Sequence, residues 1–493
     1  MDDNKLAGYS NRKLINATRW STFTEIVTKI VTPISNMILA RLLAPEIFGI
    51  VASINMVLSF CDIFADAGFQ KYVIQHEIDD YQELNKISTV AFWTNLSISV
   101  VIWIAVCAFA SPIARLVGCE GYGFAVCIAC IHLPLQACSS IPNARLKREM
   151  NFKTLFQVRL VSIFTPFVVT LPIALLTRSC WALIIGNLAN NFMVALVAFI
   201  RVKWKPQFYF SMTQLKQMLS FSVWSTLEAI LVWLINWGDM FIVGMFLSSH
   251  YLGIYKTSIN MVNSILAVIS SSLSPVMLSA LSRLQGDNEQ FKKVFYKISM
   301  YSGLLLLPMG VGMLVYRETM CDIVLGSAWS EGTVLMGIWG FISAIAILFN
   351  TYSGCVYIAK GKPKISAIVQ ICQIVTIIPA VYISAQMSFE CLSYTRALIR
   401  IIGMVIHCFA VWKIAGISTF VTLKKLVPSI IATSVMAIAG MWFVSLEMGL
   451  LFEIASIIIC AILYAGILCL FPNIRQPVFA MVKTKLVKRG KKE

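Results

Sequence analysis

Apolar stretches of about 20 residues alternate with short polar segments along the whole chain. A helix needs about 20 residues to cross the hydrocarbon core of a bilayer, so each stretch predicts a membrane-spanning helix. We predict fourteen such helices, near residues 16–40, 48–69, 87–109, 121–141, 154–176, 179–200, 217–247, 254–280, 297–316, 332–358, 365–386, 391–412, 428–446 and 450–471. Because fourteen is even, both termini are predicted to lie on the same side of the membrane.

The composition favours an all-α integral membrane protein. Of the 493 residues, 58% are hydrophobic and 13% are charged, whereas soluble domains carry about a quarter charged residues. No polar stretch is long enough to form a separate aqueous domain. The first apolar stretch is longer than the core of a signal peptide and lacks a small-residue cleavage pattern, so we expect it to be retained.

The basic residues predict the orientation of the chain. With a cytoplasmic N-terminus, 30 of the 40 Lys and Arg fall in inside segments, and only Arg41, Arg115, Arg178 and Arg317 fall outside. This asymmetry is the positive-inside pattern, so the net charge of +17 indicates membrane topology rather than nucleic-acid binding. We expect the basic tail, 473–493, to anchor the topology, with binding of anionic lipid head groups as the alternative.

A short internal repeat divides the chain. Leu43–Val57 resembles Leu247–Val262, with Gly-Ile recurring at an offset of 204 and Ile-Asn-Met-Val at 205. The two segments join the first predicted helix to the second and the seventh to the eighth, which are equivalent places in two parallel halves; chance similarity between apolar segments is the alternative. We therefore predict an N-lobe of six helices over 1–200, a C-lobe of six over 201–412 that begins with a basic linker, and two extra helices with the tail over 413–493.

Polar residues form stripes on four of the predicted helices. Spacings of three and four residues put the polar side chains of 16–40 on one helical face, which cannot be meeting lipid. The stripes are Thr18, Thr22, Glu25, Lys29, Thr32 and Asn36 on the first helix, Asn55, Ser59, Asp62 and Asp66 on the second, Glu228, Asn236 and Asp239 on the seventh, and Lys256, Asn260 and Asn263 on the eighth. These helices are the first two of each half, and the pattern predicts a wet surface along them.

Eleven ionisable residues fall within the predicted spans, six of them basic and five acidic. Each costs about 2.5–3.5 kcal/mol near the bilayer centre unless it is paired, hydrated or able to reach the interface. Glu25 and Lys29 are spaced for an ion pair on one helix, so a structural role and a functional role are both open. Asp62 and Asp66 cannot neutralise each other, so either a cation from another helix lies between them or one is protonated, which makes them candidates for coupling to protons or cations.

Two further basic residues, Arg396 and Arg400, form a pair on the twelfth predicted helix. They could bind an anionic head group, but extension of Arg396 toward the outside surface is the simpler reading. The near balance of acidic and basic groups leaves the charge of any cargo open.

Several chemical signals are absent or weak in the sequence. No Walker A motif occurs, so ATP hydrolysis is not the expected energy source. Cys127 and Cys130 form a C-x-x-C pattern near His132, but in the middle of a predicted span, so no metal or other cofactor is expected. Four cysteines on the outside half could form a disulfide, namely Cys119, Cys180, Cys321 and Cys391. No outside loop exceeds about 15 residues, which weighs against an enzyme with an outside catalytic domain.

Motifs in the first half of the chain resemble the Wzx-type polysaccharide flippases of the multidrug/oligosaccharidyl-lipid/polysaccharide exporter superfamily. The similarity is dense over residues 10–260 and thin afterwards. It is carried by Ala40–Glu46 (ARLLAPE), Phe48-Gly49, Asp66–Phe69 (DAGF), Val73–Gln75, Ala91–Trp93, Ser111–Ala114, Arg145–Phe152, Asp239 with Gly244, and Leu252–Tyr255. The resemblance implies two six-helix lobes around a central cavity lined by the first, second, seventh and eighth helices, the same four that carry the polar stripes.

The resemblance further implies an activity and candidate residues. The expected function is to move an isoprenoid-diphosphate-linked oligosaccharide from the cytoplasmic to the outer leaflet of a bacterial inner membrane by ion-gradient-coupled alternating access. Candidate substrate-binding residues are Lys29, Asn36, Asn55, Arg159, Lys256, Asn260 and Asn263, and candidate ion-coupling residues are Glu25, Asp62, Asp66, Glu228 and Asp239. We expect a monomer whose partners are this substrate, membrane lipids and other polysaccharide-assembly proteins. The alternatives are a cation-coupled drug exporter of the same superfamily and, with less support, a membrane enzyme of glycan assembly.

Overall fold

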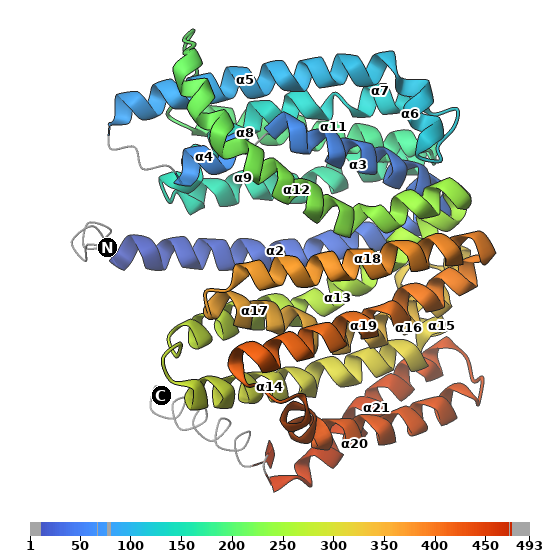
Figure 1. Ribbon diagram of the computed structural model, residues 1–493. Coiled ribbons are helices and arrows are strands. Elements are labelled where there is room, and N and C mark those ends of the chain that lie inside the picture. The colour runs from blue at the N-terminus through green and yellow to red at the C-terminus, as the bar shows by residue number, and fades with distance from the viewer. Residues whose placement is uncertain (1–10, 67, 76–79, 473, 476–493) are drawn as a thin grey trace, which may run out of the picture. The chain divides into compact units, whose positions relative to one another are not determined.

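The computed structural model describes residues 11–66, 68–75, 80–472 and 474–475 (Figure 1). All regular structure in these residues is helical. Thirteen helices are long and apolar enough to span a membrane, and their positions match the second to fourteenth predicted spans. The helix α2 (Asn11–Leu42) matches the first predicted span in length but carries the polar stripe, which lowers its hydropathy below that of the others. The predicted all-α membrane fold is confirmed.

Residue contacts divide the chain into two compact units at Thr257 and Ser258. Unit 1 contains α2 together with α3 (Pro45–Asp66), α4 (Phe69–Gln75), α5 (Tyr81–Ala108), α6 (Ala110–Leu116), α7 (Gly123–Ala129), α8 (His132–Arg148), α9 (Phe152–Thr165), the π-helix η1 (Pro166–Thr170), α10 (Leu171–Thr177), α11 (Cys180–Arg201), α12 (Met212–Phe246) and the start of α13 (Ser249–Ser282). Within this unit α8 packs on α5, α11 and α4, and α2 packs on α9.

Prolines interrupt two of the spans in unit 1. Pro134 has no N–H to donate to the carbonyl of Cys130, so the fourth span is broken between α7 and α8, where Leu133 N donates to Cys130 O at 3.0 Å. Pro166 likewise cannot donate to Ser162, and the fifth span passes through η1, whose last bond runs from Leu171 N to Pro166 O. Broken and π-helical segments inside membrane helices often mark functional positions.

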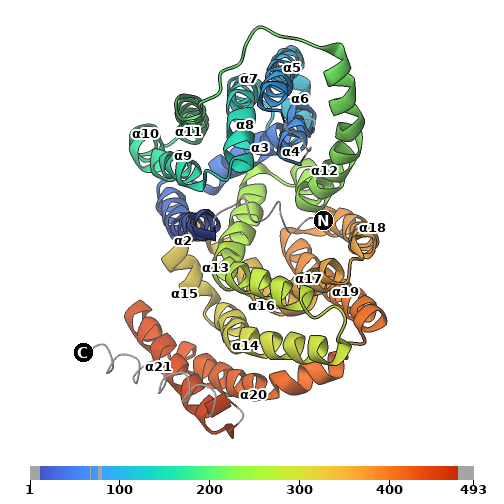
Figure 2. The ribbon, with the colours of Figure 1, turned by 90° about the vertical axis from the view of Figure 1, so that its left-hand side faces the viewer.

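Unit 2 is built around the long helix α14. It contains the rest of α13 with α14 (Asn288–Val315), α15 (Arg317–Val324), the 3₁₀ helix η2 (Ser327–Gly332), α16 (Thr333–Ala346), the π-helix η3 (Ile347–Thr351), α17 (Tyr352–Ala359), α18 (Pro363–Met387), α19 (Phe389–Ala415), α20 (Thr419–Val444) and α21 (Leu450–Cys469). Figure 2 shows α20 beside α14 and α21 beside α20, in agreement with their contacts. Tyr464 of α21 donates to the Leu304 carbonyl at 2.8 Å, so the last two spans are attached to α14.

The internal repeat brings two glycines together inside unit 1. A Cβ atom on Gly49 of α3 would lie 1.7 Å from the Ser249 carbonyl oxygen, and a Cβ on Gly253 of α13 would lie 1.9 Å from the Pro45 carbonyl oxygen. Each glycine thus lies against the carbonyl of the residue four positions before the other glycine. Gly253 follows Gly49 by 204 positions, and Ser249 follows Pro45 by the same number. The equivalent segments therefore contact each other reciprocally, which requires two residues without side chains.

Polar contacts surround this glycine crossing. The Ser249 hydroxyl donates to the Gly118 carbonyl at 3.0 Å, and His250 Nδ1 lies 2.6 Å from Glu46 Oε1. The first bond ties the start of α13 to the loop that precedes α7, and the second contact joins the start of α13 to the start of α3. The crossing is therefore fixed by both backbone fit and hydrogen bonding.

We predict that Gly49→Ala and Gly253→Ala each lower the stability of the protein. The added methyl group would meet a backbone carbonyl that cannot rotate away, so the loss should reach or exceed the ~1–3 kcal/mol typical of overpacking. The measurement is the thermal unfolding midpoint of the purified protein in detergent. Gly238→Ala is the matched control, because nothing lies within 4 Å of its Cβ position. Equal midpoints for all three variants would contradict the close approach.

Candidate functional site

A polar cavity of about 680 Å³ lies inside unit 1. Side chains from α2, α3, α5, α8, α9 and α11 surround it. Its polar lining consists of Thr24, Glu25, Asp62, Asp66, Gln70, Asn95, Ser99, Gln136, Ser139, Ser140, Asn143, Lys147, Arg159, Ser162, Asn190 and Asn191. Hydroxyl and amide groups dominate this lining, with carboxylates and cationic groups on opposite helices. Such a surface would be costly against lipid, so the cavity is suited to water and polar ligands.

A second cavity, of about 320 Å³, adjoins the first between α2, α9, η1 and α11. The two cavities share Arg159, Ser162 and Asn190 as lining residues. The stripe of α2 runs past both, because Thr24 and Glu25 line the first, and Thr28, Thr32, Ser35 and Asn36 line the second. Of the predicted stripe, Glu25, Thr32 and Asn36 therefore line these cavities, which we call together the polar track.

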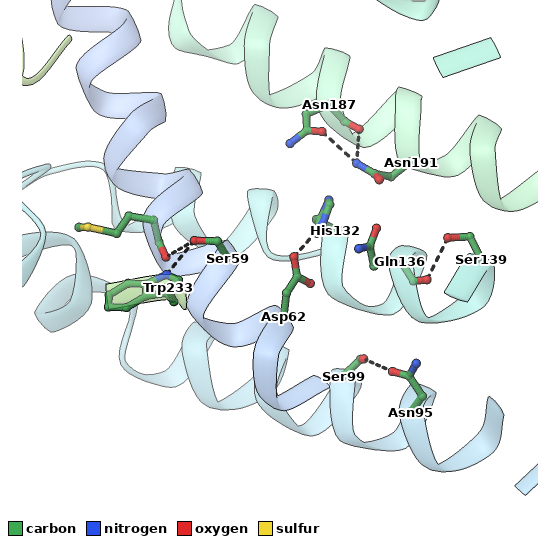
Figure 3. A network of polar contacts seen from close by, with 11 residues as sticks. Ser59, Asp62, Asn95, Ser99, His132, Gln136, Ser139, Asn187, Asn191 and Trp233 are labelled. Carbon is green, nitrogen blue, oxygen red and sulfur yellow. Dashed lines mark hydrogen bonds and ion pairs between the residues drawn. The ribbon is translucent and has the colours of Figure 1, made fainter. Parts of the chain in front are cut away.

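The two carboxylates of α3 have separate partners on α8. Asp62 Oδ2 lies 3.3 Å from His132 Nε2, as Figure 3 shows. Asp66 Oδ1 accepts a hydrogen bond from the Ser140 hydroxyl at 3.1 Å, and the Gln70 amide lies 3.4 Å from the same hydroxyl. His132 thus contacts Asp62 and Ser140 contacts Asp66, so each of the two carboxylates has its own partner on α8.

Further polar pairs surround Asp62 (Figure 3). Ser99 and Asn95 of α5 are hydrogen bonded at 3.4 Å, and the Asn191 amide donates to Asn187 Oδ1 at 2.9 Å on α11. On the other side of α3, Trp233 of α12 donates to the Ser59 hydroxyl at 3.0 Å. The carboxylate is thus framed by groups that can donate or accept hydrogen bonds from several helices.

Other predicted site residues of unit 1 lie away from the two cavities. Lys29 is half-buried and lines neither, and no ion pair joins it to Glu25 in the described part of the chain. Asp239 is buried, with 6% of its surface exposed, and accepts hydrogen bonds from the Tyr255 hydroxyl at 2.8 Å and from Met240 N at 2.9 Å.

Three more of the predicted site residues belong to unit 1, namely Lys256, Asn55 and Glu228. The ammonium of Lys256 stands 4.0 Å from the ring centre of Trp237. Asn55 lines a pocket of only about 10 Å³ together with Asn187. The side chain of Glu228, like those of Thr18 and Thr22, lies outside the described residues.

In unit 2 the predicted polar residues gather on one tryptophan. Trp339 of α16 donates from Nε1 to Asn263 Oδ1 at 3.1 Å. The guanidinium groups of Arg396 and Arg400 lie 4.9 and 4.3 Å from the Trp339 ring centre, and Arg400 also donates to the Ser343 hydroxyl. Arg396 is 9% exposed, so it packs inside the unit rather than extending away. Asn260, by contrast, is exposed.

Comparison with known proteins places the chain in a family. A profile described as polysaccharide biosynthesis protein matches residues 38–334, which is more than half of the chain. The chain belongs to the polysaccharide biosynthesis protein family. This family assignment confirms the resemblance seen in the sequence motifs.

Relatives of this polysaccharide biosynthesis protein are distant but cover most of its length. It is 24% identical over 337 residues to the succinoglycan biosynthesis transport protein ExoT of Rhizobium meliloti (strain 1021), covering 68% of this chain and 67% of the relative. It is 21% identical over 409 residues to the lipopolysaccharide biosynthesis protein WzxC of Escherichia coli (strain K12), covering 81% of each. These relatives are named for transport and biosynthesis of surface polysaccharides.

A solved structure with the same fold is a lipid II flippase, MurJ, in an inward closed conformation. The TM-score is 0.74 at 13% sequence identity, over 91% of this chain and 98% of that chain. At this identity the match concerns the fold alone, and it shows that this family member has the same helical arrangement.

Sequence reasoning missed several residues of the cavity. Asn190 and Asn191 of α11 follow Asn187 by three and four residues, which is the same spacing that identifies the stripe on α2. His132 was considered only as a metal ligand. Pro134, two residues after His132, is the sequence feature that indicates an interrupted helix at this position.

The cysteines of this family member are all free. None of the 14 forms a disulfide, including the four on the predicted outside half. Burial raises the pKa of Cys119 to about 11 and, with the charge of Asp322, that of Cys321 to about 12, so both thiols stay protonated. In the described residues no three His, Cys, Asp or Glu side chains are placed to hold a metal ion.

We predict that the cavity of unit 1 is filled with water. In hydroxyl-radical footprinting of the purified protein in nanodiscs, the lining residue Phe152 should be oxidised at least about five times faster than Phe69 and Phe291. These two phenylalanines have no exposed surface and line neither cavity, and ordered water close to a side chain promotes its oxidation. Similar rates for all three rings would indicate a dry cavity.

Proposed function

We propose that this protein moves isoprenoid-diphosphate-linked oligosaccharides from the cytoplasmic to the outer leaflet during cell-surface polysaccharide biosynthesis. The observation that carries the proposal is the polar track in unit 1, lined by amide and hydroxyl groups from α2, α5, α8, α9 and α11. Sugar hydroxyls form hydrogen bonds with these same groups. Family membership and the named relatives support the same cargo class.

Arg159 is our leading candidate for the diphosphate. It is exposed, projects from α9 and lines both cavities of the track. A guanidinium is always charged and can donate two parallel hydrogen bonds to a phosphate. Asn36 lines the second cavity and is proposed to contact the sugars. Lys29, Asn55, Lys256, Asn260 and Asn263 remain further candidates for substrate contact.

We further propose that an ion gradient drives an alternating-access cycle through the carboxylates of the first cavity. Glu25, Asp62 and Asp66 all line it, so each can exchange an ion with the water of the cavity. Asp239 is buried and already hydrogen bonded, which makes it a weaker candidate, and Glu228 remains one on its sequence position alone.

One observation favours a second candidate function, the export of small cations. The first cavity is lined by three carboxylates against two permanently cationic groups, Lys147 and Arg159, and such a balance attracts cations. Enzymatic chemistry is not proposed, because the relatives are named as transport and biosynthesis proteins of the membrane.

The setting of the protein is proposed on the same grounds. We place it in the inner membrane of a bacterium as a multi-pass monomer, with both termini cytoplasmic, working with other polysaccharide-assembly proteins. The functional lobes are proposed to be residues 1–200 and 201–412. Residues 413–493 are proposed to add two further helices and the basic tail. The asymmetry of the basic residues supports this orientation.

The test is flipping of a fluorescent isoprenoid-diphosphate oligosaccharide in proteoliposomes. Arg159→Ala should reduce the initial rate by about tenfold or more, because it removes the bidentate donor to the diphosphate. Arg115→Ala is the matched control, since Arg115 is an exposed residue of α6 that forms an ion pair with Glu120 and lines neither cavity. Full activity of Arg159→Ala would contradict its assignment. Export of small cations without movement of any lipid-linked sugar would replace the flippase by the second candidate function.

A further inference from the structure

We propose that Asp62 and His132 together form a proton-binding site and that the proton is the coupling ion. The proposal rests on the proposed ion-coupled transport and specifies its ion and its site. Asp62 is on α3 and His132 is the first residue of α8, with 3.3 Å between Oδ2 and Nε2. The site requires both side chains, which come from different helices and contact each other there.

The position of His132 follows from the break in the fourth span. Pro134 prevents the helix from continuing through Cys130, and α8 begins anew at His132. Cys130 and Ile131 keep right-handed helical backbone angles, so the imidazole projects from a tight turn inside the span rather than from an unwound segment.

Water reaches one member of the pair, and the other is largely enclosed. The side chain of Asp62 is 28% exposed and lines the 680 Å³ cavity, whereas that of His132 is 13% exposed. His132 Nδ1 is buried and has no hydrogen-bond partner among the described residues. A proton can thus enter through the carboxylate and be held by the imidazole, whose second nitrogen is not committed to a structural bond.

A proton fits the chemistry of this site better than a sodium ion. Sodium is held by several oxygen ligands, and here a nitrogen that becomes cationic on protonation occupies the position facing the carboxylate. Histidine is also the side chain that changes charge near neutral pH. Binding one proton changes the pair from a carboxylate beside a neutral imidazole, with net charge −1, to a neutral ion pair. The net charge of the pair is therefore different in the two forms.

The surroundings of the pair contain charges of both signs. Facing it across the cavity are Glu25 of α2, Asp66 of α3, Lys147 of α8 and Arg159 of α9, while the neighbouring thiols are Cys61, Cys107, Cys127 and Cys130. The lining from α5 and α11 is made of Asn and Ser side chains, and α12 contributes the Trp233–Ser59 bond. Lys147 and Arg159 offset Glu25 and Asp66, so the charge of the first cavity changes from −1 to zero when the pair takes up a proton.

The first experiment measures the proton directly, without transport. The chain has four histidines, so ¹⁵N-histidine NMR of the protein in nanodiscs can assign His132 from its loss in His132→Gln. The ¹⁵N resonances of His132 should respond to pH as the pair binds one proton. Asp62→Asn should change that response, because it removes the facing negative charge. A His132 that keeps one protonation state throughout, or whose titration is unchanged in Asp62→Asn, would overturn the site.

The second experiment tests coupling in proteoliposomes with the same fluorescent substrate. A pH gradient should accelerate flipping by wild type several-fold, and His132→Gln should lose this acceleration. His407→Gln is the matched control, because His407 is buried in unit 2 and bonded to Tyr357 at 2.9 Å, and it should respond like wild type. Acceleration of His132→Gln by the pH gradient, or of wild type by sodium alone, would overturn the proposal. If wild type moved no lipid-linked sugar, the proposed function would fail, while the NMR titration would still decide whether the pair binds a proton.

Discussion

The energetic cost of a charge in hydrocarbon shapes the interior of this protein. Carboxylates and guanidiniums within membrane spans must meet water or each other. In unit 1 that requirement is met by turning the polar faces of α2, α3, α8, α9 and α11 toward one cavity. Apolar side chains then face outward on these helices, as the exposed Phe64 and Phe192 illustrate. The same division explains why helices of high overall hydropathy still enclose a polar track.

Two proline interruptions give the polar track its irregular walls. The break before His132 and the π-helical segment at Pro166 both lie in helices that line it. Gly186 lies against this π-helix, because a Cβ there would stand 2.0 Å from the Thr170 hydroxyl oxygen. Backbone irregularity in a membrane helix is tolerated where neighbouring groups or water satisfy the freed carbonyls. The polar groups around the cavity can therefore satisfy the backbone groups that the helix interruptions leave without helical partners.

Sequence reasoning recovered the fold well because bilayer thickness and hydropathy act on each helix separately. Each of the fourteen predicted spans falls on a helical segment of the described chain, although α14 and α20 begin nine residues before the predicted starts. The polar stripe of α2 predicted a polar surface, and Glu25, Thr32 and Asn36 of that stripe line the two cavities. The partners of the charged residues were not recoverable in this way. His132 contacts Asp62 because α8 begins beside α3. Arg396 of α19 contacts Trp339 of α16. Both contacts depend on how the helices pack, which hydropathy does not encode. The shared role of Arg159 in two cavities is likewise a property of three packed helices.

The reciprocal contact of Gly49 and Gly253 has a consequence for how this protein can change. Each glycine is opposed by a main-chain carbonyl oxygen of the other segment, and a main-chain atom cannot be made smaller by mutation. A lineage that acquires a larger residue at one position therefore cannot be rescued by trimming a side chain at the other. Genetic suppressors of such a change should instead fall at residues that let α3 or α13 shift as a whole.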